Sequence, residues 1–137
     1  FYKKILPLVK NAALKSKVIF QIGYVYFAMG DFNQTEKYLL KIVENESCHP
    51  DIYNLLAYCY AKANKKLESA LKFVNMAVKG SPVNCHYLDT KGFVLLRLGR
   101  IEESIKTFKY ALSVAPTEKD KEKIFGHLQN AILIGKR

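Results

Sequence analysis

Small residues recur along this chain of 137 residues at an almost constant spacing. Gly23, Ala57, Gly92 and Gly126 follow one another at intervals of 34, 35 and 34 residues. A glycine inside a helix costs roughly 1 kcal/mol relative to alanine, so each repeated glycine needs a compensating gain. A period of this length indicates a repeat array, whose units stack to bury one continuous apolar core.

Each period is predicted to contain two helices. Apolar residues recur at helical spacing, as at Ile105 and Phe108, and strand-like alternation is absent from the sequence. The first helices are expected over residues 17–29, 51–63 and 86–98, and the second helices over residues 32–45, 67–79 and 101–114. Gly30, Asn64 and Gly99 should end the first helices, because glycine and asparagine adopt left-handed backbone conformations easily. The extra residue of the middle period falls in the turn after Asn64, where an insertion is tolerated best.

These periods resemble tetratricopeptide repeats (TPRs), whose pattern is W-x2-L-G-x2-Y, then A-x3-F, then P, every 34 residues. The third period matches best, with Leu88, Gly92, Leu95, Ser104, Phe108, Ala111 and Pro116 in the corresponding places. The second matches with Tyr53, Leu56, Ala57, Tyr60, Ala70, Val74, Ala77 and Pro82, and the first with Ile19, Ile22, Gly23, Tyr26, Thr35, Leu39 and Ile42. In this family the small residue lets the helices of a hairpin approach closely, with alanine or serine opposite it, which would explain Gly92.

The resemblance implies an all-α fold, a right-handed superhelix (α-solenoid) of helix-turn-helix hairpins with a C-terminal capping helix. The expected parts of this single domain are a partial preceding helix over 1–15, repeats over 16–49, 50–84 and 85–118, and a capping helix or the start of a fourth repeat over 119–137. The opening residues 1–13 would match the second helix of a preceding unit, in which Pro7 should end or kink the helix.

In TPR proteins the first helix of each unit lines a concave groove, which often binds an extended peptide or a partner's helix. The corresponding residues here are Phe20, Tyr24, Phe27, Asn54, Tyr58, Lys62, Asp89, Phe93, Arg97 and, in the C-terminal helix, His127. Lys62 and Arg97 occupy equivalent places, and basic side chains there would select a partner segment that carries acidic residues.

Four rings also occupy equivalent places in successive units, at Tyr24, Tyr58, Phe93 and His127. They are expected to form a ladder along the groove, offering a large contact area for an apolar or aromatic segment. The alternative is that the rings fill the core between adjacent first helices. Both interpretations are consistent with the sequence.

A subset of the family clamps a partner's C-terminal carboxylate with lysine, asparagine and arginine. The corresponding places here hold Phe20, Tyr24, Leu55, His86 and Thr90. The clamp is therefore absent, and chaperone tails are not expected to bind by that route.

Sequence signatures of catalysis are missing. The histidines belong to no H-E-x-x-H sequence, and no P-loop or nucleophile elbow occurs. His86 and Asp89 lie three residues apart on a predicted helix, close enough for a hydrogen bond. The dipeptides Cys48-His49 and Cys85-His86 repeat near two junctions, but their spacing fits no standard zinc pattern. We therefore expect no enzyme, no cofactor and no metal.

The chain carries a net charge of +10 from 19 lysines and 3 arginines. Such a balance suits an acidic protein, nucleic acid or an anionic surface, although the scarcity of arginine makes nucleic acid the weaker candidate. Three cysteines, an odd number in a chain long enough to fold without disulfides, indicate a reducing and hence cytoplasmic setting. No apolar run approaches the ~20 residues of a membrane span.

The sequence thus predicts a non-catalytic protein–protein interaction module that binds a peptide or helix of a partner in its groove. One alternative is a self-associating assembly scaffold, in which end helices stack between chains to form a homo-oligomer. Another is charge-driven binding to nucleic acid or an anionic surface, which would weaken strongly as salt rises.

Overall fold

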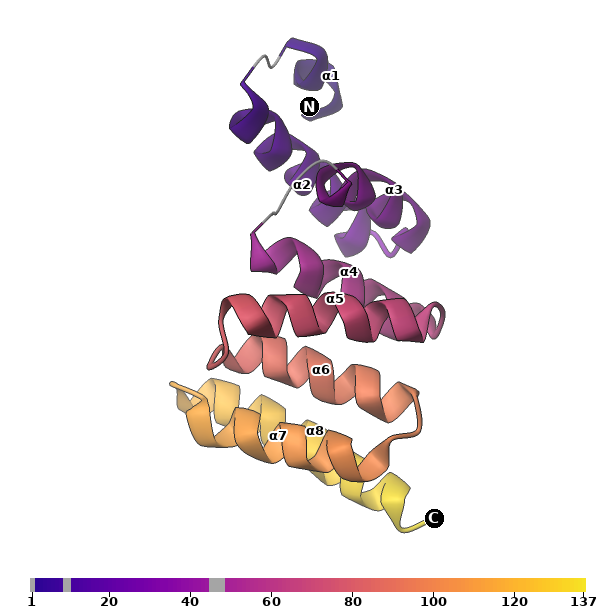
Figure 1. The fold of residues 1–137 in the computed structure, drawn as a ribbon, viewed down its shortest axis with the longest axis vertical. Helices are drawn as coiled ribbons and strands as arrows, with labels where there is room; N and C mark the ends of the chain where they lie inside the picture. The colour runs from indigo at the N-terminus through magenta and orange to yellow at the C-terminus, as the bar shows by residue number, and fades with distance from the viewer. Residues whose placement is uncertain (1, 9–10, 45–48) are drawn as a thin grey trace.

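The computed structural model describes residues 2–8, 11–44 and 49–137. In chain order the elements are α1 (Tyr2–Ile5), the 3-10 helix η1 (Leu6–Leu8), α2 (Ala12–Ala28), α3 (Phe32–Val43), α4 (Pro50–Ala63), α5 (Leu67–Gly80), α6 (Cys85–Arg97), α7 (Ile101–Val114) and α8 (Glu118–Gly135) (Figure 1). None of these described residues lies in a β-strand. Over the same ranges, no helix has the length and apolar character needed to cross a membrane.

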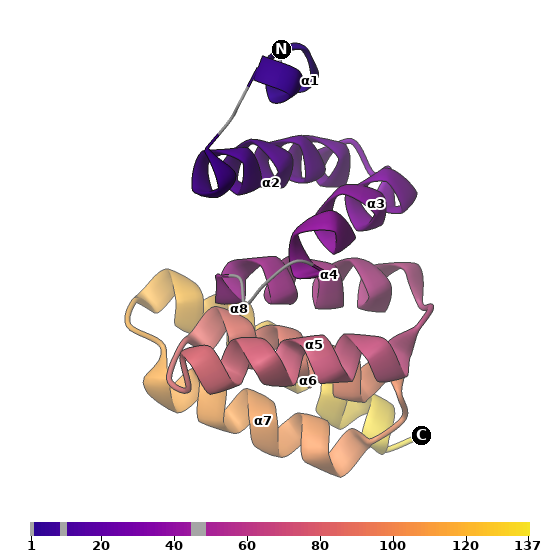
Figure 2. The same ribbon diagram turned by 45° about the horizontal axis from the view of Figure 1, so that its top comes forward.

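The helices form hairpins that stack in chain order along the long axis of the molecule (Figure 1). The hairpins are α2–α3, α4–α5 and α6–α7, and contacts between them run from α3 to α4, from α5 to α6 and from α4 to α6. Figure 2 shows the same succession, from α1 at one end through α2 to α7 at the other. The predicted fold class, an α-solenoid of helical hairpins, is confirmed.

The first helix of each hairpin ends within one residue of its predicted end, and the predicted stop residues follow it. Gly30 and Gly99 follow α2 and α6 with φ angles of 81° and 82°, and Asn64, at the equivalent place after α4, has a φ of 52°. Glycine adopts this left-handed region without strain, and asparagine tolerates it better than most residues. Lys66 is also left-handed, with a φ of 50°. The turn after α4 therefore absorbs the extra residue of the middle repeat, and both flanking helices stay regular.

The repeated glycines allow close packing within a hairpin. A Cβ atom added to Gly92 would lie 2.5 Å from Cε1 of Phe108, and one added to Gly23 would lie 3.1 Å from Cδ2 of Leu39. The Gly92 interpretation is therefore confirmed in its main point. It differs in one detail, because the nearest atoms belong to a phenyl ring and not to the alanine or serine that was expected opposite.

Hydroxyl groups reinforce two of these close approaches. Ser104 donates to the carbonyl of Gly92 over 2.7 Å, and Thr35 donates to the carbonyl of Gly23 over 3.1 Å, both in buried surroundings. The middle repeat has Ala70 at the corresponding place, which is fully buried and carries no hydroxyl. In the first and third repeats a buried hydrogen bond therefore links the two helices of the hairpin. In the middle repeat apolar packing alone joins them at this place.

The N-terminal segment matches its prediction in one respect and differs in another. Among the described residues 2–8, α1 ends at Ile5 and a 3-10 turn that contains Pro7 follows, as predicted for this proline. The next helix, α2, begins at Ala12, five residues before the predicted start at residue 17. The side chain of Asn11 caps it by accepting a hydrogen bond from the backbone N–H of Leu14. The sequence analysis overlooked this cap. The predicted end of the next helix at residue 45 lies outside the described residues.

Helix α8 covers the end of the third hairpin. Its buried residues Ile124, Leu128 and Ala131 join the core cluster that contains Leu88 and Phe108. On its other side, a Cβ atom added to Gly126 would meet no atom within 4 Å. Gly126 therefore holds the repeat position of the other glycines but has no helix packed closely against it. The places that correspond to Leu88 and Leu95 hold the polar residues Glu122 and Gln129. These two polar residues suit a terminal helix of a solenoid, whereas Phe125 and Leu133 leave apolar surface exposed on the same helix.

Two tyrosines make polar links between adjacent hairpins. Tyr60 donates to Glu36 over 2.5 Å, and Lys66 reaches the same carboxylate oxygen at 2.6 Å. Tyr87 makes the corresponding link between the second and third hairpins by donating to Asp51. Burial acts to raise the pKa of Glu36, but the hydrogen bonds from Lys66 and Tyr60 outweigh it and lower that pKa below its ordinary value.

Candidate binding groove

The first helices of the hairpins and α8 line a groove of about 870 Å³. Nine of the ten residues predicted for the groove lie on its wall: Tyr24, Phe27, Asn54, Tyr58, Lys62, Asp89, Phe93, Arg97 and His127. The tenth, Phe20, does not line it; its ring packs against the core, with its centroid 6.5 Å from that of Tyr24. The repeat register therefore brings residues from four helices to one surface, because equivalent positions on stacked helices face the same way.

A continuous series of rings runs across this groove. Tyr24 lies 6.1 Å from Phe27, Phe27 meets Tyr58 edge-on at 5.6 Å, and Tyr58 lies 5.8 Å from Phe93 between centroids. We call these four residues the ring chain. Tyr24 is 51% exposed, whereas Phe27 and Phe93 also pack against the buried core. The rings therefore fill the space between adjacent first helices and line the groove at the same time.

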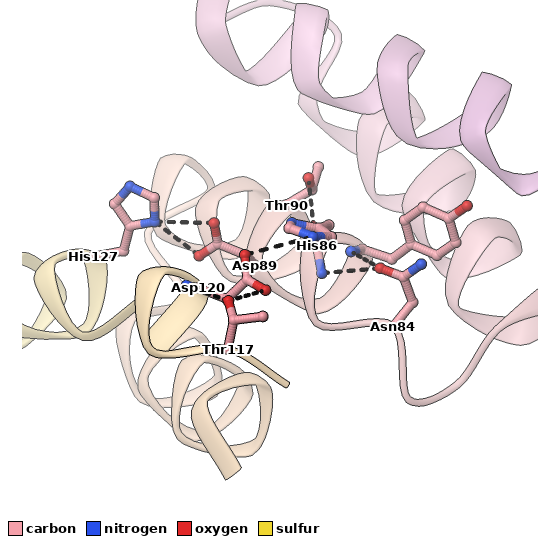
Figure 3. Close-up of polar contacts among 8 residues, drawn as sticks. Asn84, His86, Asp89, Thr90, Thr117, Asp120 and His127 are labelled. Carbon is pink, nitrogen blue, oxygen red and sulfur yellow. Dashed lines mark hydrogen bonds and ion pairs between the residues drawn. The ribbon is translucent and has the colours of Figure 1, made fainter. Parts of the chain in front are cut away.

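His127, the fourth ring of the predicted ladder, does not belong to the ring chain. The His127 ring lies 6.0 Å from the ring of Phe108, on the groove wall but outside the ring chain. Its Nδ1 atom donates to the carboxylate of Asp89, at 2.8 Å and 3.1 Å from the two oxygens (Figure 3). An ionised carboxylate can only accept, so this contact assigns the ring proton to Nδ1.

Helix α8 also changes the pairing of His86. A hydrogen bond between His86 and Asp89 was considered from their spacing, but each residue instead contacts α8. The Nε2 atom of His86 lies 3.7 Å from Asp120, while Asp89 receives His127 (Figure 3). Two His–Asp contacts therefore join α6 to α8. The histidine of one contact, His86, lies on α6, and the histidine of the other, His127, lies on α8.

The groove wall is basic. Lys62, Arg97 and Lys123 line it, and the guanidinium of Arg97 stacks over Phe93 at 5.1 Å from the ring centroid. Among the described lining residues, Asp89 alone carries a carboxylate. It is 8% exposed and hydrogen-bonded to His127. A partner in the groove would therefore meet rings and cations, with little competing negative charge.

Several lining residues were missed by the sequence analysis, including His86, Thr90, Lys123, Asn130 and Ile134. The residues on α8 could have been found by extending the repeat register, since Lys123 follows Asp89 by 34 positions. Asn54 adds a polar feature that register alone does not show: its Oδ1 atom is buried and has no hydrogen-bond partner among the described residues.

The thiols of the described residues are poorly suited to nucleophilic chemistry. Cys59 and Cys85 are both buried and unpaired. Burial raises the pKa of Cys59 to about 12, and it also raises the pKa of Cys85. A thiol that keeps its proton at neutral pH is a weak nucleophile. Cys48, the remaining cysteine, lies outside the described residues.

Fold and groove together define a helical-repeat module of the kind that binds other proteins. Residues 16–47 and 86–118 match the tetratricopeptide repeat family model. These segments coincide with the first and third predicted repeats, and residues 50–84 fold into the same kind of hairpin between them. The chain belongs to the tetratricopeptide repeat family.

Solved structures with the same fold include peptide complexes and part of an enzyme. The first TPR of Spaghetti (RPAP3) bound to the HSP90 peptide SRMEEVD matches with a TM-score of 0.77 and 18% identity, over 90% of this chain and 98% of that one. PcrH in complex with the chaperone binding region of PopD matches with a TM-score of 0.80 and 13% identity, over 93% and 98%. An O-GlcNAc transferase mutant from Thermobaculum terrenum matches with a TM-score of 0.80 and 18% identity, over 90% of this chain but 23% of that chain. At these identities the likeness concerns the fold alone. No curated protein matches the sequence.

Proposed function

We propose that this domain is a non-catalytic module that binds a partner protein in its groove. The observation that carries the proposal is the ring chain, which lies beside the cations Lys62, Arg97 and Lys123. The occupant that fits this surface is an extended or helical segment with apolar or aromatic side chains and acidic residues. Aromatic rings give large contact areas at a low cost in conformational entropy, and basic neighbours select for acidic groups.

The structural neighbours support this kind of occupant. Two of them were solved with a segment of another protein, an HSP90 peptide in one case and a region of PopD in the other. The SRMEEVD peptide is itself acidic. This chain lacks the carboxylate clamp, however, because Phe20, Tyr24, Leu55, His86 and Thr90 stand in the corresponding places. We therefore propose an internal acidic and aromatic segment as the ligand.

The buried thiols favour a reducing compartment for this activity. Cys59 and Cys85 are both free and both packed into the core, where neither stabilises the fold through a disulfide. We propose a cytoplasmic setting on this ground.

Self-association is the alternative that one observation favours. At the N-terminal end of the stack, α2 leaves Leu14, Val25 and Met29 exposed, with Met29 72% accessible. A molecular mass that rises with protein concentration in sedimentation equilibrium would support a scaffold built from end-to-end contacts.

Two groove variants should test the binding proposal by affinity capture from a lysate of the source cells. Tyr58→Ala/Phe93→Ala removes two of the four rings of the ring chain, and Lys62→Glu/Arg97→Glu reverses two exposed charges. We expect each to lower retention of the partner at least about tenfold, because the first loses apolar contact and the second loses the charge match.

The matched control is Tyr110→Ala, which truncates a ring that is 48% exposed and does not line the groove. It should capture the same protein as the wild type. Circular dichroism and thermal melting establish that each variant is folded, and the charge variant covers the case in which loss of two half-buried rings unfolds the domain. Equal capture of one partner by the wild type and both groove variants would contradict the proposal. Loss of binding at moderate salt would instead point to charge-driven association.

A further inference from the structure

The start of α6 and the first turn of α8 bring three metal-ligating side chains together. The Sγ atom of Cys85, a ring nitrogen of His86 and a carboxylate oxygen of Asp120 lie within 4.8 Å of one another. Cys85 and His86 are the first two residues of α6, and Asp120 is the third residue of α8. The dipeptide Cys85-His86 is visible in the sequence. Asp120, 34 residues after His86, lies beside it only because α8 packs on α6 (Figure 3).

We propose that Cys85, His86 and Asp120 form a zinc site, with water as the fourth ligand. Thiolate, imidazole and carboxylate are the three side-chain ligands that zinc takes in proteins, and three protein ligands with one open position is an established arrangement. In tetrahedral zinc geometry the ligand atoms lie about 3.3–3.8 Å apart. An N···O pair lies about 3.4 Å apart, so the 3.7 Å between Nε2 of His86 and Oδ1 of Asp120 needs to shorten only by a few tenths of an ångström, while all three ligand atoms start within 4.8 Å of one another.

Hydrogen bonds to the backbone and side chains hold these ligands in place. Asn84 caps α6 by accepting from the N–H groups of His86 and Tyr87, at 3.0 Å and 3.2 Å. Thr117 caps α8 by accepting from the N–H of Asp120, and its hydroxyl donates to Oδ2 of the same residue at 2.8 Å. The other carboxylate oxygen, Oδ1, is then the one turned to His86 (Figure 3). Outer hydrogen bonds of this kind orient metal ligands and fix which atom binds.

Charge and accessibility are compatible with a divalent ion. Two helix N-termini meet here, and their partial positive charge disfavours a cation. On binding, Zn²⁺ displaces the proton of the Cys85 thiol, which is released to water. The resulting thiolate and the Asp120 carboxylate supply two negative charges, which balance the charge of Zn²⁺. Cys85 is 3% exposed, while the His86 side chain is 57% exposed. The ion would therefore enter from the His86 side and bind with the thiolate shielded from water.

This proposal departs from the sequence-based expectation of no metal, which considered the spacing of the two Cys-His dipeptides alone. It goes beyond the groove function, because a zinc ion here would tie α8 to the third hairpin, and of its three ligands only His86 also lines the groove. Binding to the folded state alone raises the free energy of unfolding by RT ln(1 + L/Kd), where L is the free ligand concentration. Zinc should accordingly raise the melting temperature.

Cobalt provides a direct test on the full chain after removal of metal with a chelator. We expect one equivalent of Co²⁺ to produce a thiolate-to-cobalt charge-transfer band together with the strong visible bands of four-coordinate cobalt. One equivalent of Zn²⁺ should remove both. The melting temperature should rise with zinc. A wild-type protein that gives no charge-transfer band would overturn the proposal.

Variants assign the ligands. Asp120→Asn preserves an acceptor for Thr117 and should fold, yet we expect it to bind cobalt at least about tenfold more weakly. Cys85→Ser should lose the charge-transfer band. His49→Gln, which alters the other Cys-His dipeptide, is the control and should bind as the wild type does. If Asp120→Asn bound with wild-type affinity and spectrum, the cluster would not be the site and the proposal would fail, whatever the folding state of Cys85→Ser.

Discussion

Replacing Gly92 with alanine should destabilise the protein by about 2 kcal/mol, even though alanine is the better helix former. The added Cβ would lie 2.5, 2.6 and 2.8 Å from three ring carbons of Phe108. That ring is 1% exposed and surrounded by core, so it has no space to move aside. Overpacking of this kind costs about 1–3 kcal/mol, and we expect a value near the upper end, offset by about 1 kcal/mol of helix propensity.

Gly126→Ala is the matched control, because Gly126 holds the same place in the repeat with no atom within 4 Å of an added Cβ. It should stabilise the protein by up to about 1 kcal/mol through helix propensity alone. Gly23→Ala should fall between the two, since the neighbouring Leu39 atom lies 3.1 Å away on a flexible side chain. Urea denaturation of the three variants measures their free energies of unfolding and so gives the order of the three effects. Equal shifts at Gly92 and Gly126 would show that the Phe108 contact is not what selects glycine.

Raising the pH above about 9 should destabilise the protein by about 1.4 kcal/mol per pH unit through Cys59 alone. Burial raises the pKa of this thiol from its ordinary value of 9.0 to about 12. Between these two values the unfolded chain releases the proton and the folded protein retains it. The folded state therefore binds more protons, and its stability falls as pH rises. Below pH 9 both states hold the proton, and the thiol adds no pH dependence.

The slope of stability against pH isolates this effect. Cys59→Ala should lower the slope measured by urea denaturation between pH 9 and 10.5 by about 1.4 kcal/mol per unit. Part of the alkaline loss should remain above pH 10, because burial and the hydrogen bonds to Glu36 and Asp51 raise the pKa of Tyr60 and Tyr87. Tyr110→Phe, which removes an exposed phenol, is the control and should leave the slope unchanged. An identical slope in Cys59→Ala and the wild type would rule out the buried thiol as its source.

Much of the hairpin architecture could be predicted because its signals are local. Gly30, Asn64 and Gly99 end helices through their own backbone preferences, and the structure confirms all three. The groove wall was also predictable, because a residue that recurs at one register on stacked helices faces one surface. Phe20 shows the limit of that argument: it was predicted for the groove from its register, but it packs against the core and does not line the groove.

The pairings that involve α8 could not be predicted in the same way. His86 was expected within reach of Asp89 on its own helix, but the two residues pair with Asp120 and His127, respectively. The angle at which α8 packs on α6 sets these contacts. That angle depends on the shapes of many buried side chains at once, and no short stretch of sequence encodes it.

The sequence by itself determined the period, the helix pairs, the turns between them and the face that each first helix presents. These features follow from residue spacing and from the conformational freedom of single residues. Only the tertiary structure decided that the phenyl ring of Phe108 is what Gly92 accommodates, that the ring chain is both core and groove wall, and that Cys85, His86 and Asp120 meet. Each of these depends on distances between atoms far apart in the chain, which dense packing of the whole solenoid sets and which a repeat pattern leaves open.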